Sequence, residues 1–209
     1  MRVDWSGGQV PALVRGKELG RHRALVSDPK RVAAVLIAQG APRAWQRSLD
    51  AAVRGVSEAL EAPRPTAESV LAAAAAKVRQ HAASLVDEHA VQVHAVAISL
   101  AADGQAELAT AGSCRAYLDR RGQQRRVSSA EATKGLADAF AFSRTSEPLE
   151  PGDVVVLGPS HLFGVLGVAR LAKLLAPGEG VDARRIVRGL LTVPGLEETG
   201  AAAVALRLV

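Results

Sequence analysis

The chain is poor in cysteine and in aromatic residues, and both shortages exclude classes of function. Cys114 is the single cysteine among 209 residues, which excludes an intramolecular disulfide and a zinc site built from several cysteines. Phe, Trp and Tyr together make up 3% of the sequence, and the basic residues behind the net charge of +5 are dispersed among acids. Nucleic-acid surfaces combine clustered basic and aromatic side chains, so the composition predicts no nucleic-acid partner.

Long hydrophobic runs are also missing. Even the longest purely apolar runs, such as Val32 to Ala38, are far shorter than the roughly 20 residues that cross a bilayer. The first residues, Met1 to Gly8, include an acid and a tryptophan where a signal peptide needs an apolar stretch of roughly 7 to 15 residues. We therefore expect no membrane span, a cytoplasmic location and a single domain over residues 1–209, in which residues 1–8 form a loose tail.

What the sequence does contain is a regular succession of helical and strand patterns. Apolar residues recur at helical spacing from Pro42 to Leu60, and Thr66 is placed to cap a second helix that runs to about Asp87. Strand patterns surround this helix pair at 31–38, 91–100, 106–111, 115–118, 153–157 and 201–208, and two further helices are predicted at 168–175 and 182–191. This order fits a layered α+β sandwich.

Two motifs in this succession resemble those of one enzyme family. The segment Leu149 to Asp153 reads Leu-Glu-Pro-Gly-Asp and leads into an apolar strand, and Gly112 to Arg115 places a glycine and an arginine in a hairpin. Both are similar to motifs of the metal-dependent Ser/Thr protein phosphatases of the phosphatase 2C family. The resemblance implies a four-layer αββα sandwich, in which two antiparallel sheets face each other and a helix pair covers each outer face.

The resemblance also implies an active site, and there the sequence departs from the family. Phosphatases of this kind hold two Mg²⁺ or Mn²⁺ ions with carboxylates, because hard cations need oxygen ligands. The chain has other residues at the positions where the acids are expected. These positions are Ala38, the run Arg21, His22 and Arg23, then Ser160, and finally Thr199 and Gly200. Basic groups near the lost site would repel a dication.

We therefore expect a pseudophosphatase without catalytic residues, metal or cofactor. As a regulatory module it would bind a protein partner, such as a kinase or a phosphoprotein. Arginine can hold a phosphate with two hydrogen bonds, so a phosphate-binding site without hydrolysis is a further expectation. Its candidate ligand-binding residues are Arg21, Arg23, Arg115 and His161.

Two alternatives remain open from the sequence. Glu197 and Glu198 lie one or two residues from the expected position of an acid, and with His22 and His161 they would form a rebuilt metal centre of an active phosphatase. The other alternative is a structural subunit that uses the old site as an assembly surface.

Other candidate features favour structural roles. Ser160 and His161 are expected in a loop, because the surrounding residues match the nucleophile elbow of hydrolases poorly. The arginines at 120, 121, 125 and 126 bracket Gly122 and predict a solvated hairpin tip, with a grip on phosphate as the alternative. Cys114 is expected to be a buried strand residue.

Overall fold

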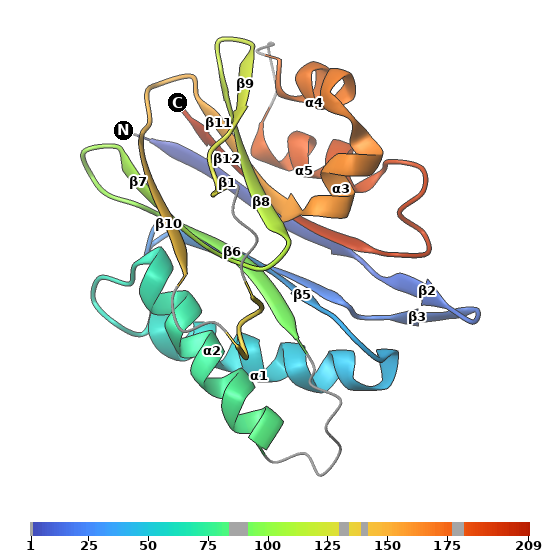
Figure 1. Cartoon of the computed structure of the whole chain (residues 1–209). Coiled ribbons are helices and arrows are strands. Elements are labelled where there is room, and N and C mark those ends of the chain that lie inside the picture. Colours follow the sequence, from blue (N-terminus) through green and yellow to red (C-terminus); the bar gives the residue numbers. More distant parts are fainter. Residues whose placement is uncertain (1, 84–91, 130–133, 139–141, 177–181) are drawn as a thin grey trace.

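Two five-stranded antiparallel sheets lie face to face and carry helices on their outer faces (Figure 1). The computed structural model describes residues 2–83, 92–129, 134–138, 142–176 and 182–209. Sheet I has the strand order β1 (Val3–Val10), β12 (Ala201–Leu208), β11 (Val154–Pro159), β8 (Cys114–Arg120) and β9 (Gln123–Arg126). Sheet II has the order β10 (Ser143–Pro148), β7 (Gln105–Ala111), β6 (Val93–Leu100), β5 (Val32–Ala38) and β4 (His22–Ser27).

The helices complete the αββα order that the sequence predicts. The pair α1 (Pro42–Leu60) and α2 (Ala67–Ala83) packs on sheet II, while sheet I is covered by α3 (Ser160–Leu166), α4 (Val168–Leu175) and α5 (Ala183–Leu191). A small ribbon of β2 (Ala12–Val14) and β3 (Lys17–Leu19) projects beyond the sheets (Figure 1). No helix among the described residues is long and apolar enough to cross a membrane.

The continuous apolar sequence of β5 follows from its position between two cores. Val35 and Ile37 contribute to the core between the sheets, whereas Leu36 and Ala38 pack toward α1 and α2. Side chains alternate between the faces of a strand, so a strand buried on both faces must be apolar at every position.

The helix pair is the part of the fold that local sequence predicts best. Pro42 occupies the first turn of α1, where its missing N–H costs nothing. The N-terminus of α2 is capped as predicted, since the backbone N–H of Ser69 donates to Oγ1 of Thr66 at 3.1 Å. Gly55 lets the helices approach closely, because a Cβ there would lie 2.4 Å from the carbonyl oxygen of Ala73. The predicted end of this helix, near residue 87, lies outside the described residues.

The N-terminal segment is a strand and not the loose tail expected for residues 1–8. Residues 3–10 form β1, which pairs antiparallel with β12 over its whole length. A Cβ on Gly7 would lie 3.0 Å from Val26 of β4, and one on Gly8 would lie 3.0 Å from Val187 and Leu191 of α5. The glycines therefore allow β1 to fit between sheet II and a helix, and they do not mark a flexible end.

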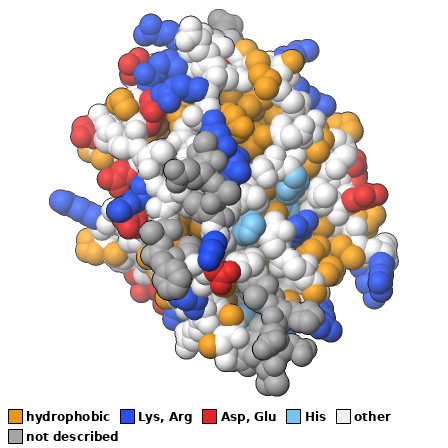
Figure 2. Space-filling view, viewed as in Figure 1, with side chains coloured by type: hydrophobic (Ala, Val, Ile, Leu, Met, Phe, Trp, Pro, Cys, Tyr) orange, Lys and Arg blue, Asp and Glu red, His pale blue; other side chains and the backbone are white. Residues whose placement is uncertain are grey.

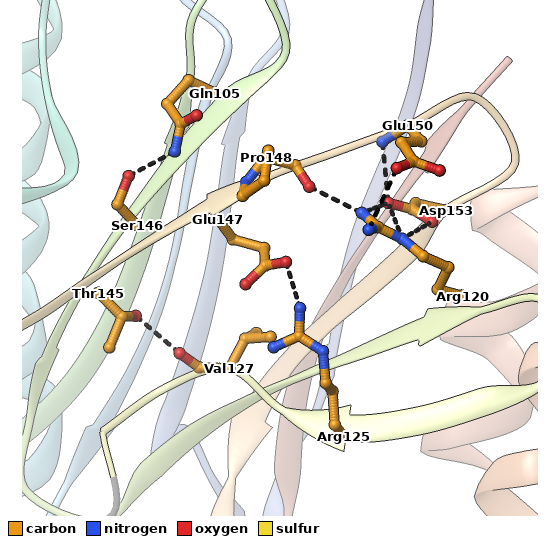
Figure 3. Close-up of polar contacts among 10 residues, drawn as sticks. All are labelled: Gln105, Arg120, Arg125, Val127, Thr145, Ser146, Glu147, Pro148, Glu150 and Asp153. Carbon is orange, nitrogen blue, oxygen red and sulfur yellow. Dashed lines mark hydrogen bonds and ion pairs between the residues drawn. The ribbon is translucent and has the colours of Figure 1, made fainter.

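The Leu-Glu-Pro-Gly-Asp motif is a structural turn that joins both sheets to the β8–β9 hairpin (Figure 3). Asp153 is only 2% exposed, and its carboxylate accepts hydrogen bonds from Nε of Arg120 at 3.0 Å and from the backbone N–H of Glu150 at 2.9 Å. Arg120 also donates to the carbonyl oxygen of Pro148 at 2.7 Å. The motif that most strongly suggests a phosphatase thus serves the fold.

Three hairpin arginines contact neighbouring groups of the chain. Arg121 lies 3.8 Å from the carboxylate of Glu150, and Arg125 pairs with Glu147 of β10. Arg126 donates to Oγ of Ser128 at 3.2 Å. The pair of Arg125 and Glu147 connects β9 to β10 (Figure 3).

Candidate functional site

Two histidines share a row across the end of sheet II. His22 of β4 lies opposite Ile37 of β5, and Ile37 lies opposite His94 of β6. Ile37 faces the core between the sheets. Directly opposite residues share a face of the sheet, so His22 and His94 both face the space between the sheets at its edge.

A third histidine, at the start of the helix that follows β11 of sheet I, lies in the same place. His161 lies 5.4 Å from His22, measured between ring centroids, and its Nε2 lies 2.9 Å from the carbonyl oxygen of Gly200. Ser160 and His161 are the first residues of α3, which corrects the expectation of a loop. A helix forms there because Leu162, Phe163 and Leu166 can all be buried against sheet I.

Arg21 provides the positive charge of the cluster. Its Nε donates to the carbonyl oxygen of Ala38 at 3.0 Å, and its Nη2 donates to Oε1 of Gln39 at 2.9 Å. The guanidinium lies 4.9 Å from the centre of the Trp45 ring, in a cation–π contact. No carboxylate among the described residues pairs with it, and burial lowers the pKa of Arg21.

His22 is buried and lacks hydrogen-bond partners. It is 1% exposed, and neither ring nitrogen bonds to any residue that the structure describes. Burial, followed by the nearby charges of His161, Arg21 and Arg23, lowers the pKa of His22 to about 2. The imidazole is therefore neutral at physiological pH.

The hydrogen bonds of His94 define its protonation. The backbone N–H of Ser113 donates to Nδ1 at 3.1 Å, and the Ser113 hydroxyl lies 2.8 Å from the same nitrogen. A backbone N–H can only donate, so Nδ1 carries no proton and the proton of the neutral ring sits on Nε2. Burial, and then the charges of Arg21 and Arg115, lower the pKa of His94.

The structure separates the arginines that the sequence grouped with Arg21. The guanidinium of Arg23 is directed to α1, where it donates to Oε1 of Gln46 at 3.1 Å and lies 4.0 Å from Asp50. Arg115 folds back on the β7–β8 turn and donates to the carbonyl oxygen of Cys114 at 2.7 Å. Arg23 is thus directed away from the predicted site, and Arg115 lies at its border.

The residues of this site do not fit a divalent cation. Oxygen atoms that such an ion would use, on Ala38 and Gln39, already accept hydrogen bonds from the positive Arg21. Glu197 and Glu198 are exposed, and the carboxylate of Glu197 accepts from the backbone N–H of Gly195 at 2.8 Å. Across the described part of the chain, no group of three or more His, Cys, Asp or Glu side chains is placed to hold a metal ion.

Cys114 has the structural role expected from the sequence. It is fully buried in the core between the sheets, and burial raises the pKa of its thiol to about 12 despite the neighbouring Arg115. Such a thiol is a poor nucleophile at neutral pH.

Comparison with known proteins identifies the fold. No protein-family profile matches the chain, and neither does the sequence of any curated protein. Among solved structures, PppA of Pseudomonas aeruginosa aligns with a TM-score of 0.80 and 17% identity over 100% of this chain and 99% of that one. The serine/threonine phosphatase PstP of Mycobacterium tuberculosis aligns with a TM-score of 0.79 and 14% identity, over 99% and 98%.

A third structure carries the name of the fold. The phosphatase 2C domain of SpoIIE from Bacillus subtilis aligns with a TM-score of 0.69 and 16% identity, over 99% of this chain and 61% of that one. The chain has the phosphatase 2C fold. The described cluster brings together Ala38, His22, His161 and Gly200 through Arg21 and two histidine contacts.

Four contributors to the cluster were not predicted from the sequence. Gln39 and Trp45 hold Arg21, and His94 and Ser113 form the second half of the cluster. His94 is not part of any sequence motif. Only the register of β5 and β6 brings it into the row with His22. Histidine side chains reach the surface near the middle of the face in Figure 2.

Proposed function

We propose that this chain is a phosphatase 2C-like module that binds a protein or phosphorylated ligand and does not hydrolyse phosphoesters. One observation carries the proposal: the guanidinium of Arg21 binds the Ala38 and Gln39 oxygens at the end of β5. A fixed cation there opposes the entry of Mg²⁺ or Mn²⁺ by charge repulsion. His22 and Ser160, which stand where acids are expected, add no negative charge to offset it.

Two related structures support a binding role by contrast and by analogy. The catalytic domain of PstP is described in complex with two manganese ions, whereas the present cluster offers no comparable set of acids. PppA is described as a key regulatory component of the T6SS, so regulatory use of this fold has a precedent. We infer a cytoplasmic module of phosphorylation signalling whose partner is a kinase or a phosphoprotein. Fold alone does not fix function, so the site residues carry the argument.

The test is a calorimetric titration of the purified chain with Mn²⁺ and Mg²⁺, combined with turnover of p-nitrophenyl phosphate in the same buffers. We expect neither stoichiometric binding nor turnover. Binding with turnover would refute the proposal. If Glu197→Gln then abolished that turnover, the active centre would be the rebuilt site that includes Glu197.

The structural-subunit alternative makes a different prediction. A chain that acts only in assembly should form a defined oligomer through the edge of the sandwich, without any ligand. Light scattering measures the mass of the ligand-free chain in solution. A defined oligomer would favour the structural subunit, whereas a monomer would favour the ligand-binding module.

A further inference from the structure

We propose that Arg21 and His94, beside the buried His22, form a metal-free binding site for one phosphate-like oxyanion. The proposal rests on the proposed function and assigns its ligand class. The site occupies the end of the sandwich where His22, Arg21 and His161 meet, and its chemistry follows from three separate observations.

The first observation is a positive charge without a counter-ion. A guanidinium has five N–H groups, and Arg21 uses one on Nε and one on Nη2 for Ala38 and Gln39. Among the described residues no carboxylate pairs with Arg21, and Asp138, an acid of a neighbouring loop, bonds to Gln92 instead. The remaining N–H groups of Arg21 are therefore available for an anion.

The second observation is that Arg21 is already held in place. The two hydrogen bonds to the end of β5 and the contact with Trp45 fix the plane of the guanidinium. A side chain that is ordered before binding loses little conformational entropy when the ligand arrives. Arg21 is thus prepared to bind two oxygen atoms of one tetrahedral anion.

The third observation is the supply of neutral donors around the charge. His94 carries its proton on Nε2, because Nδ1 accepts from Ser113. His22 is 1% exposed with both ring nitrogens unpartnered in the described structure, a costly arrangement that an accepting ligand would relieve. His161 borders the cluster 5.4 Å from His22, but it donates its Nε2 proton to the carbonyl oxygen of Gly200 and offers no donor to the anion. Donors and positive charge together suit a phosphate group and oppose a cation.

The test measures binding of inorganic phosphate to the full chain by calorimetry and ³¹P NMR, in buffer with EDTA so that no metal contributes. A phosphoserine peptide and its unphosphorylated form are titrated in parallel. We expect saturable binding of phosphate, tighter binding of the phosphopeptide and no binding of the unphosphorylated peptide. Tighter binding of the phosphopeptide than of phosphate identifies a phosphorylated side chain as the source of the anion, whereas equal binding identifies free phosphate.

The variants compare two neighbouring arginines. Arg21→Gln removes the charge from the cluster and should weaken phosphate binding roughly 10- to 100-fold, the range for a hydrogen bond to a charged group. Arg23→Gln is the matched control, because Arg23 contacts Gln46 and Asp50 on the helix side of β4. This variant should leave phosphate binding within about twofold. Circular dichroism spectra test whether both variants fold. If Arg21→Gln unfolds, His94→Ala takes its place and is expected to weaken phosphate binding severalfold.

Two outcomes would overturn the site. One is the absence of phosphate binding in EDTA, and the other is an equal loss of affinity in Arg21→Gln and Arg23→Gln. The proposed function is tested separately by turnover with Mn²⁺. If phosphate binds in EDTA and turnover with Mn²⁺ is also observed, the proposed lack of catalysis is refuted and the anion site is retained. If both phosphate binding and turnover are absent, only the anion site is refuted.

Discussion

Removing Arg120 should destabilise the fold far more than removing its neighbour Arg121. The carboxylate of Asp153 is 2% exposed and accepts hydrogen bonds from Nε and Nη2 of Arg120, at 3.0 and 2.6 Å. Arg120→Ala would leave this charge buried with one remaining donor, the backbone N–H of Glu150. Breaking a buried ion pair by removing one partner costs about 3–5 kcal/mol. The side chain of Arg120 is 29% exposed, so we expect the lower end, about 3 kcal/mol.

Arg121→Ala is the matched control for this experiment. The side chain of Arg121 is 87% exposed and its ion pair with Glu150 measures 3.8 Å, which predicts a loss of less than about 1 kcal/mol. Urea unfolding followed by circular dichroism gives both differences in the free energy of unfolding. Equal losses in the two variants, or a loss below about 1 kcal/mol for Arg120→Ala, would show that the Asp153 turn does not depend on this ion pair.

Three further predictions concern packing, protonation and reactivity. Gly55→Ala should cost about 1–3 kcal/mol in urea unfolding, because its Cβ would lie 2.4 Å from the carbonyl of Ala73, whereas Gly164→Ala, with no atom within 4 Å, should be neutral or stabilising. The folded pKa of His22 is about 2, below the unfolded value of 6.5, so stability should fall as pH drops below 6.5. The loss reaches about 2 kcal/mol at pH 5, and unfolding of His22→Leu at pH 7 and 5 should lack this part of the pH dependence. Cys114 should resist a thiol reagent in the native chain and react in urea, because its pKa is about 12, and rapid native labelling would contradict its burial.

Local sequence was sufficient for the elements whose pattern repeats along one stretch of chain. The helices at 42–60 and 168–175 and the capping role of Thr66, which accepts from the backbone N–H of Ser69, follow from periodicity and from capping chemistry. β1 was missed because Gly7 and Gly8 resemble turn residues when read locally. Their purpose becomes visible only when β4 and α5 are placed on either side of the strand.

The candidate site was half predictable for the same reason. Ala38, His22 and His161 were found through motif positions, which encode neighbours in space without giving their geometry. The assignment of Arg23 to the site was wrong, because strand alternation places it with Leu25 on the helix side of β4. His94 could be recognised only from the register of β5 against β6, which depends on pairing across more than 50 residues.

The positive charge of Arg21, at an edge where a metal-dependent phosphatase has acids, connects the fold to the proposed function. In a metal-dependent phosphatase, acids gather at this edge and are stabilised by the ions that they bind, so losing the acids removes both the chemistry and a source of local order. In this chain, the positive charge is the guanidinium of Arg21, which donates a hydrogen bond to the end of β5 and stacks on Trp45. In the proposed module, these contacts of Arg21 order the edge of the sandwich without the help of a metal, and the positive charge of Arg21 favours an anion. If Arg21→Gln retained the fold but lost phosphate binding, the same residue would account for both the proposed exclusion of a metal and the binding of an anion.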